Sequence, residues 1–446
     1  MQIKTIIIAN IAEAFESIIG EIKFIKQKKE RLQTEHSLCD RALLWGEDNK
    51  IVITPFIIPE KLLRKNIKLL KFKNVKNISP RKINISLSDA IRLDKKLLST
   101  LCNIIQNNPG VKISPYCVTK KFLALAEYFK IKKLNFVVQE RPSNSNDWLI
   151  SYLDSKVGSR MIINEVKDLN ARTPQSLVCR TKDEAIEAVH WFWNNNCPCI
   201  LKANFGESGW GLIPIKKNLF KNKQEVTKHI KKEFQKDSIW NRDLILVEEY
   251  IQQKKLISRS PSVEVFLSEK SPKVTYICNQ ILNKKGNFLG VVLGKNSLPT
   301  KLKTKLTTTS LEIGKKFWNL GYRGFFDIDF IISRKGSPYV IETNTRRTGG
   351  THVYDVVKTI FGKDWEQNAF VMSQDNFYYG KNRLDEQKIL DKMKKILYPI
   401  NGRKEGAIIS IVSQWQPFYG FIIVGSSQKR VSEIHKKMLN IWKIKN

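Results

Sequence analysis

The stretch Gly324–His352, GFFDIDFIISRKGSPYVIETNTRRTGGTH, constrains the fold of this chain more than any other. Phe325–Ile332 is rich in isoleucine and phenylalanine, which predicts a buried strand, and Tyr339–Thr343 predicts a second strand running back. The intervening Arg334–Ser337 is turn material, because Gly336 accepts a positive φ at little cost. The stretch therefore predicts a β-hairpin.

Acidic and amide side chains of this hairpin are expected to share one face. If the turn is centred on the Lys-Gly pair, Asp329 lies opposite Glu342 and Asp327 lies opposite Asn344. Directly opposed Cβ atoms sit roughly 4.5–5.5 Å apart, so two carboxylates there repel each other. A hard divalent cation would offset that cost, with Asp329, Glu342 and Asn344 as its oxygen ligands. The alternative is a buried hairpin whose carboxylates make ordinary salt bridges.

Two arginines, Arg346 and Arg347, follow this hairpin and precede Gly349–Gly350. Fixed cations beside an acidic metal floor suit a polyphosphate ligand, because guanidinium groups match phosphate oxygens in geometry and charge.

A glycine-rich segment between two predicted strands forms a second candidate site. Pro198–Ala203 predicts a strand that carries Lys202, and Leu212–Ile215 predicts the next strand. Backbone N–H groups of a glycine-rich hairpin can approach phosphate oxygens closely. No GK[ST] sequence and no helix follow it, so it is neither a P-loop nor a Rossmann turn. The small residues of this loop are Gly206, Ser208, Gly209 and Gly211.

Asp329 together with Glu342–Arg346 resembles the metal-binding signature of the ATP-grasp superfamily. The continuation Arg347–His352 is similar to ATP-grasp ligases that carry a pre-ATP-grasp N-terminal domain, the pheganomycin-type ligases. The resemblance implies an α/β chain of the ATP-grasp (α+β) class that joins a carboxylate to an amine. The reaction would use ATP and Mg²⁺, with Mn²⁺ as an alternative ion, pass through an acyl phosphate, and release ADP and phosphate.

The resemblance also implies roles for individual residues. Lys156 and Lys202 would contact the phosphates, and the glycine-rich loop would cover them. The backbone of Tyr250 and Ile251 would contact the edge of the adenine base, and Glu248 would accept a hydrogen bond from the exocyclic amine of adenine. The ribose hydroxyls would be bound by Glu264.

Three cationic or titratable side chains are the implied catalytic groups. Arg346 would stabilise the transferring group and the tetrahedral intermediate. Arg347 and His352 would either hold the substrate carboxylate or take the amine proton, and the sequence does not choose between these roles.

The chain is expected to form three domains. Residues 1–150 alternate short strands and helices, which predicts a parallel α/β layer similar to a pre-ATP-grasp domain. Residues 151–385 would form the ATP-grasp domain, with a lid over about 157–250, and residues 386–446 a small C-terminal α/β domain. Within the first domain, Ala42–Trp45 is expected as a strand, Ala12–Gln33 as one helix, and Ser88 as the cap of a helix over Asp89–Ile105.

The formal net charge of +35, from 77 Lys+Arg against 42 Asp+Glu, favours anionic partners in general. However, lysine, asparagine and isoleucine are enriched throughout, and the basic residues form no long block, which indicates compositional drift. Nucleic acid is therefore not expected as a partner. The expected partners are an amino acid or other carboxylate and an amine or peptide acceptor. The alternatives are an ATP-grasp phosphotransferase and a non-catalytic nucleic-acid-binding protein, although no nucleic-acid reader motif is recognisable.

The seven cysteines have no zinc-site spacing and predict no disulfide framework, which suits a reducing cytoplasm. The N-terminal apolar run is interrupted by Glu13 and Glu16, so neither a signal peptide nor a membrane association is expected. The sequence leaves a homodimer open.

Overall fold

The computed structural model describes residues 2–142, 146–206, 210–253, 260–283 and 286–444. The chain divides into two compact units. Unit 1 combines Met1–Arg141, Leu289–Ser297 and Arg346–Asn446, and unit 2 combines Pro142–Phe288 and Leu298–Thr345. The boundary between Thr345 and Arg346 falls directly after the predicted metal-binding hairpin. The predicted three-domain division stays a prediction.

The first part of unit 1 is a parallel five-stranded sheet in the order β3-β2-β1-β4-β5, as the alternation of strands and helices predicted. Its strands are β1 (Thr5–Ile8), β2 (Lys50–Ile53), β3 (Val75–Ile78), β4 (Val111–Pro115) and β5 (Phe136–Val137). The helices of this part are α1 (Ile11–Ala14), α2 (Glu16–Glu21), α3 (Ile25–Leu38), α4 (Glu60–Leu70), α5 (Leu87–Leu93), α6 (Lys95–Gln106) and α7 (Lys120–Ile131).

Three local predictions in this part were wrong. The expected strand Ala42–Trp45 lies mostly in a buried 3₁₀ helix, η1 (Cys39–Leu44), because a short apolar run does not by itself distinguish a strand from a buried helical segment. The helix expected over Ala12–Gln33 is interrupted and forms α1, α2 and the start of α3. The cap of α5 is Ser86, whose side chain accepts from the Asp89 N–H, whereas Ser88 bonds to a buried glutamate.

The second part of unit 1 contains antiparallel strands in the order β12-β15-β17-β16. They are β12 (Phe288–Gly294), β15 (Phe370–Tyr378), β16 (Gly406–Val412) and β17 (Phe418–Gly425). The helices here are α13 (Thr351–Phe361), α14 (Trp365–Asn368), α15 (Glu386–Met393) and α16 (Gln428–Ile441). Aromatic and aliphatic side chains of these strands pack against α15 and α16 in one buried cluster.

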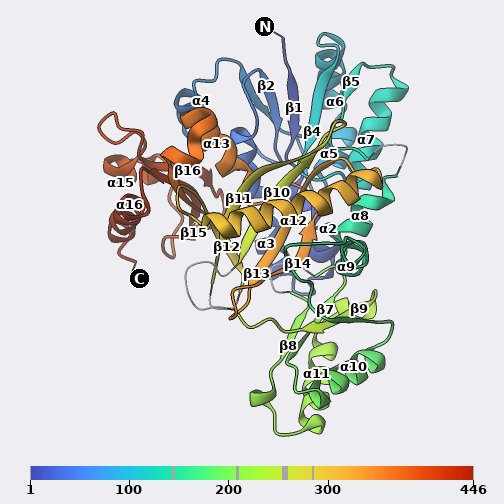
Figure 1. Ribbon diagram of the computed structural model, residues 1–446. Helices are drawn as coiled ribbons and strands as arrows, with labels where there is room; N and C mark the ends of the chain where they lie inside the picture. Colours follow the sequence, from blue (N-terminus) through green and yellow to red (C-terminus); the bar gives the residue numbers. More distant parts are fainter. Residues whose placement is uncertain (1, 143–145, 207–209, 254–259, 284–285, 445–446) are drawn as a thin grey trace. The chain divides into compact units, whose positions relative to one another are not determined.

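Unit 2 contains a core sheet with antiparallel strands in the order β14-β13-β10-β11. The strands are β10 (Pro261–Leu267), β11 (Pro272–Leu282), β13 (Gly324–Ile332) and β14 (Pro338–Asn344). The long helix α12 (Thr300–Asn319) packs on β10 and β11 (Figure 1). Two helices at the start of the unit, α8 (Trp148–Asp154) and α9 (Lys156–Asn164), contact β14.

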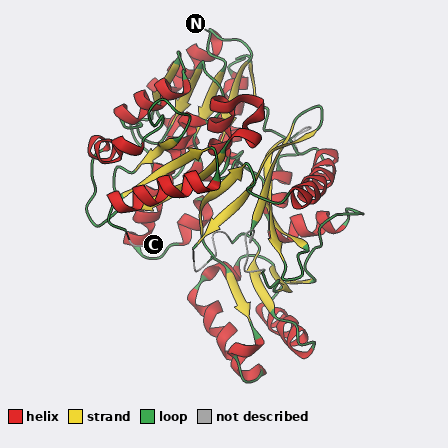
Figure 2. Ribbon diagram, turned by 60° about the vertical axis from the view of Figure 1, so that its left-hand side comes forward, coloured by secondary structure: helices red, strands yellow, loops and turns green. Residues whose placement is uncertain are grey.

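A second sheet of unit 2 lies within residues 157–250, where the sequence predicts a lid, and is called the lid sheet below; its antiparallel strands have the order β6-β9-β7-β8. They are β6 (Ser176–Cys179), β7 (Cys199–Ala203), β8 (Leu212–Ile215) and β9 (Ile245–Glu249), accompanied by α10 (Lys182–Asn194) and α11 (Lys223–Lys236) (Figures 1 and 2). The odd-numbered residues of β7 pack in the cluster with both helices. Because side chains alternate along a strand, Lys202 lies on the other face of this sheet.

The mixture of helices and strands visible in Figure 2 confirms the predicted α/β fold class. Among the described residues, no helix combines the length and the apolar character that crossing a membrane requires.

Candidate functional site

The hairpin formed by β13 and β14 has the predicted register at its acidic end. Asp329 pairs with Glu342, and Asp327 pairs with Asn344. The predicted opposition of the two carboxylates is therefore confirmed.

A β-bulge in β14 produces this register. Beyond Asp329 the pairing steps from Glu342 to Val340, which leaves Ile341 as the extra residue. The turn itself is one residue longer than the two-residue turn that the sequence suggested, because Ser333 pairs with Ser337: the Ser333 N–H donates to Ser337 O at 2.9 Å, and the Gly336 N–H donates to Ser333 O at 2.8 Å. Without the bulge this longer turn would place Asp329 opposite Ile341 instead of Glu342. The bulge thus re-aims the glutamate, as bulges near functional sites commonly do.

The neighbouring strands supply hydrogen-bond donors to the acidic row. Asn344 Nδ2 donates to Asp327 Oδ1 at 2.9 Å, and Ser262 Oγ donates to Asp327 Oδ2 at 3.0 Å. The Gln280 amide donates to Asp329 Oδ1. These neutral donors reduce the repulsion between carboxylates without cancelling their charge.

A cation already lies beside Glu342. Lys156 Nζ is 3.2 Å from Glu342 Oε2 and also donates to Gly206 O. The described residues contain no cluster of three or more His, Cys, Asp or Glu side chains placed to hold a metal. The predicted metal ligands Asp329, Glu342 and Asn344 are two carboxylates and one amide, so they differ in composition from such a cluster. Their oxygen donors fit a hard divalent ion, and the lysine shows that the position accepts positive charge.

Helix α9 delivers two cations to this region. It begins at Lys156 because Ser155 caps it, accepting from the Gly158 N–H at 3.0 Å. Lys156 and Arg160 are four residues apart, so they share one face of the helix. Gly158 permits the close approach of the preceding helix, since a Cβ there would lie 2.1 Å from Tyr152 O.

Lys202 and Glu248 form a buried ion pair on the lid sheet. Lys202 Nζ lies 2.7 Å from Glu248 Oε2, and Arg160 Nη2 lies 2.8 Å from Glu248 Oε1. Burial alone would raise the pKa of Glu248, but the charges of Lys202 and Arg160 outweigh it and hold the pKa below its usual range. The carboxylate is only 1% exposed. Cations thus engage both Glu248 oxygens in this structure, and the contact with the adenine amine that the resemblance implied for Glu248 stays a prediction.

The glycine-rich loop is described at its two ends. The Ala203 N–H donates to Gly211 O at 2.8 Å, and Gly211 has a φ of +75°, which favours glycine. A Cβ on Gly206 would lie 2.4 Å from Trp210 O, so this position also requires glycine. The predicted loop residues Ser208 and Gly209 lie outside the described residues.

The residues predicted to contact adenine and ribose are bonded or buried within unit 2. The Tyr250 N–H donates to Pro198 O at 2.7 Å, and Ile251 is buried. Glu264 is fully buried and lies opposite Asp327 in the acidic row, where Thr275 Oγ1 donates to it at 2.9 Å. The predicted contacts with adenine and ribose stay predictions.

The three predicted catalytic residues lie in unit 1. The guanidinium of Arg346 is 5.2 Å from the centre of the Phe15 ring. Arg347 is buried, and its Nη2 donates to Ser114 Oγ at 2.6 Å and to Glu140 Oε1 at 2.8 Å. These contacts give Arg347 a structural role, and its predicted part in catalysis stays a prediction.

His352 is fully buried at the start of α13. Burial, reinforced by the charge of Arg41, holds the pKa of His352 well below its usual value, so the imidazole is neutral. Its Nε2 lies 3.7 Å from Asp375 Oδ1, and Asp375 pairs with Arg41.

Sequence reasoning missed two residues of this site, Arg160 and Gln280. Arg160 was missed because the sequence pattern predicts a helix over Ile162–Leu169, which begins after this residue. The signal was present in Ser155, a residue type that commonly caps a helix, directly before Lys156. Nothing in the sequence near Gln280 indicated its position, because its contact with Asp329 depends on the pairing of β11 with β10.

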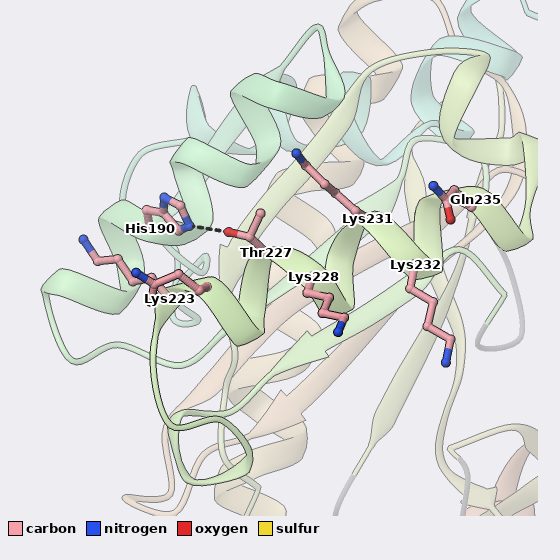
Figure 3. Close-up of a pocket in the computed structure, with 8 residues that line it drawn as sticks. His190, Lys223, Thr227, Lys228, Lys231, Lys232 and Gln235 are labelled. Carbon is pink, nitrogen blue, oxygen red and sulfur yellow. Dashed lines mark hydrogen bonds between the residues drawn. The ribbon is translucent and has the colours of Figure 1, made fainter.

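On the far side of the lid sheet, α10 and α11 form a basic groove of about 740 Å³ (Figure 3). His190 Nε2 and Thr227 Oγ1 lie 2.9 Å apart between the two helices. The lining residues are His190, Lys223, Gln224, Thr227, Lys228, Lys231, Lys232 and Gln235. This groove collects four lysines but lies on the face opposite Lys202.

Comparison with known proteins identifies the domain. Residues 162–350 match the family model described as an ATP-grasp domain. A segment of the chain is 23% identical over 150 residues to L-propargylglycine–L-glutamate ligase of Streptantibioticus cattleyicolor, covering 33% of this chain and 30% of that protein. The match therefore spans less than a third of the relative's length.

Solved structures share the fold at low identity. The biotin carboxylase domain of Hydrogenobacter thermophilus 2-oxoglutarate carboxylase, solved with MgADP, ADP and bicarbonate, has a TM-score of 0.58 at 13% identity, covering 99% of this chain and 90% of that one. Aspergillus clavatus N5-carboxyaminoimidazole synthase, solved with ADP and 5-aminoimidazole ribonucleotide, has a TM-score of 0.57 at 8% identity, covering 99% of both chains. Residues 162–350 of this chain thus match an ATP-grasp domain, in agreement with the resemblance of the sequence, and the solved structures share the fold of the chain.

Proposed function

We propose that this protein is an ATP-dependent ligase that joins a carboxylate to an amine through an acyl phosphate and releases ADP and phosphate. The observation that carries the proposal is the bulged hairpin, which sets Asp329 opposite Glu342 beside Lys156. Support comes from the ATP-grasp match over residues 162–350 and from the relative that is named as a ligase of two amino acids.

The residues of unit 2 divide into an acidic and a basic set. Asp329, Glu342 and Asn344 would hold Mg²⁺, which would neutralise phosphate charge when bound. Lys156 and Lys202 bring positive charge from α9 and from the lid. With phosphates present, Lys156 would exchange its contact with Glu342 for a phosphate oxygen, and the glutamate would become available to the metal.

The chemistry asks the protein mainly for positioning and charge stabilisation. The substrate carboxylate attacks the γ-phosphorus, the bond to the ADP oxygen breaks, and an acyl phosphate forms. The amine then attacks the acyl carbon, loses a proton, and phosphate leaves. Preorganised cations that face the developing charge typically supply the largest share of such catalysis. Arg346 is the proposed contact for the transferring group.

The substrates proposed are an amino acid or another small carboxylate and an amine or peptide acceptor. The same site would also serve a phosphotransferase that stops after the first step, and this is the second candidate function. The two differ in their products, because a phosphotransferase yields ADP without forming a C–N bond.

The test begins with isothermal titration of ADP and ATP with and without Mg²⁺. Binding that requires the metal supports the proposal, and no binding at millimolar nucleotide contradicts it. A screen for ADP release over amino acids paired with peptides, followed by mass spectrometry of the organic products, then separates the ligase from the phosphotransferase.

A further inference from the structure

Arg160 lies where the lid sheet and the core sheet of unit 2 meet. On the lid side, its Nε and Nη2 lie 3.1 Å and 2.8 Å from Glu248 Oε1. On the core side, its Nη1 donates to Val340 O and its Nη2 to Ile341 O, each at 3.1 Å. The side chain is almost completely buried. A planar guanidinium can serve both sides at once because its donors form a rigid fork.

The contacts on the lid side set the net charge of the group formed by Lys202, Glu248 and Arg160. Glu248 lies between two cations, Arg160 and Lys202, so the three groups together carry one excess positive charge. Without the arginine, Glu248 and Lys202 would form a neutral pair. A neutral pair attracts phosphate far less than a group with one net positive charge, since the interaction with an anion depends on the net charge of the group.

The core contacts fall on the bulge that aims Glu342. Ile341 is the extra residue of β14, and Val340 precedes it. A bulged residue leaves the regular ladder of hydrogen bonds, so its carbonyl needs another donor. Arg160 supplies that donor to Ile341 and fixes the strand directly before the predicted metal ligand.

We propose that Arg160 is a positioning residue of the nucleotide site. It pairs with Glu248 together with Lys202, so that the three groups carry one net positive charge that can attract phosphate, and it holds the β14 bulge that orients Glu342. This inference rests on the proposed ATP-dependent function. Lys156 and Arg160 lie one helical turn apart on the same face of α9. Through them this helix contacts Glu342 of the core sheet and Glu248 of the lid sheet.

The first measurement is the affinity for ADP with Mg²⁺, by isothermal titration, for the wild type and three variants. Arg160→Met is expected to bind at least about tenfold more weakly, because truncating one partner of a buried charge pair changes binding by more than one such step. Arg160→Lys restores the charge but not the fork, so it should recover part of the affinity. Lys228→Met removes a lysine from the outer groove and serves as the matched control, with unchanged affinity.

The decisive variant is the double substitution Arg160→Met with Glu248→Gln. It removes one positive and one negative charge, so the net charge around Lys202 returns to that of the wild type. We expect it to recover most of the nucleotide affinity lost in Arg160→Met. A purely structural role for Arg160 predicts the opposite, because a second buried contact has been removed.

Manganese binding reports the second role. Titration of Mn²⁺ into the ADP complex should show weaker metal affinity in Arg160→Lys and in the double variant, since neither can hold both bulge carbonyls. Thermal unfolding is measured alongside, and if Arg160→Met does not fold, the lysine and double variants decide.

Two results would overturn the inference while leaving the proposed function intact. One is an Arg160→Met protein that binds Mg·ADP as the wild type does. The other is a double variant that binds more weakly than Arg160→Met. A wild-type protein that binds no Mg·nucleotide would instead remove the proposed function itself.

Discussion

Lys156 Nζ lies 3.2 Å from Glu342 Oε2, so the lysine predicted to contact phosphates and the glutamate predicted to bind metal neutralise each other in this structure. Glu342 is partly exposed, with 26% of its side chain accessible, whereas Lys156 is buried. The pair can therefore open toward solvent on the glutamate side. A metal and a phosphate arriving together would satisfy both partners.

We predict that Glu342→Gln abolishes turnover while the fold is kept. The change preserves size and hydrogen bonding but removes one charge from the proposed metal shell. Losing one electrostatic stabiliser of this kind commonly costs about 10²–10³ in rate, and loss of the metal would add to that. The assay is ATP turnover, with thermal unfolding measured on the same preparation.

The matched control for this variant is Glu312→Gln. Glu312 lies on α12 and pairs with Lys315 at 2.7 Å at the surface, so turnover should not change. If folded Glu342→Gln protein turns over ATP at a near-normal rate, the hairpin is scaffold and the metal assignment has to be withdrawn.

We predict that the spent nucleotide is ADP and not AMP. Cations and a metal gathered around phosphate oxygens suit transfer of the terminal phosphoryl group. Chromatography of the nucleotide after turnover measures this directly. Formation of AMP and pyrophosphate would instead indicate an adenylating enzyme.

The hairpin shows how much of the site could be read from the sequence. The opposition of Asp329 and Glu342 was predicted correctly, but for an incomplete reason. The turn is one residue longer than expected, and the bulge at Ile341 compensates for it. Alternation along strands is visible in a sequence, whereas a bulge depends on a donor from elsewhere, here Arg160.

The fold class was predictable for a similar reason, because it rests on local periodicity and on glycine placement. The surroundings of Glu248 and His352 were not, since both depend on distant partners. Glu248 meets Arg160, which is 88 positions away in the chain, and His352 lies in a buried group with Arg41 and Asp375. None of these three partners carries a sequence signal that marks the contact.

We predict that Arg347→Met chiefly lowers stability. Arg347 is buried and bonded to Glu140 and Ser114. Removing it leaves the Glu140 carboxylate with the Ser114 hydroxyl but without its cation. Breaking a fully buried pair typically costs about 3–5 kcal/mol, and we expect a loss up to that size for this largely buried pair. Chemical denaturation measures the loss. The double variant Arg347→Met with Glu140→Gln should lose less, because the stranded charge is gone.

This pair of variants also decides the role that the sequence left open for Arg347. A substrate-binding arginine predicts a raised KM for the carboxylate substrate in both variants, including the more stable double variant. If Arg347→Met keeps wild-type stability and loses only turnover, the structural interpretation of its contacts is wrong.

Finally, we predict a pH-dependent contribution from His36. This buried imidazole lies 5.4 Å from the Phe56 ring, and burial lowers the pKa of His36 from 6.5 to about 4, partly offset by a backbone hydrogen bond at Asn84. Between those values the unfolded chain binds a proton that the folded chain does not, so this contribution to stability is complete above pH 6.5 and is lost as the pH falls toward 4.

Replacing the ring in His36→Phe removes the proton site but keeps an aromatic ring beside Phe56. The free energy of unfolding of the wild type minus that of the variant should therefore fall by up to about 1.4 kcal/mol per pH unit in this window and stay constant above it. Denaturant titrations of both proteins from pH 4.5 to 8 measure this difference, in which titrations common to both proteins cancel. A difference that does not change with pH would mean that His36 titrates alike in the folded and unfolded chains.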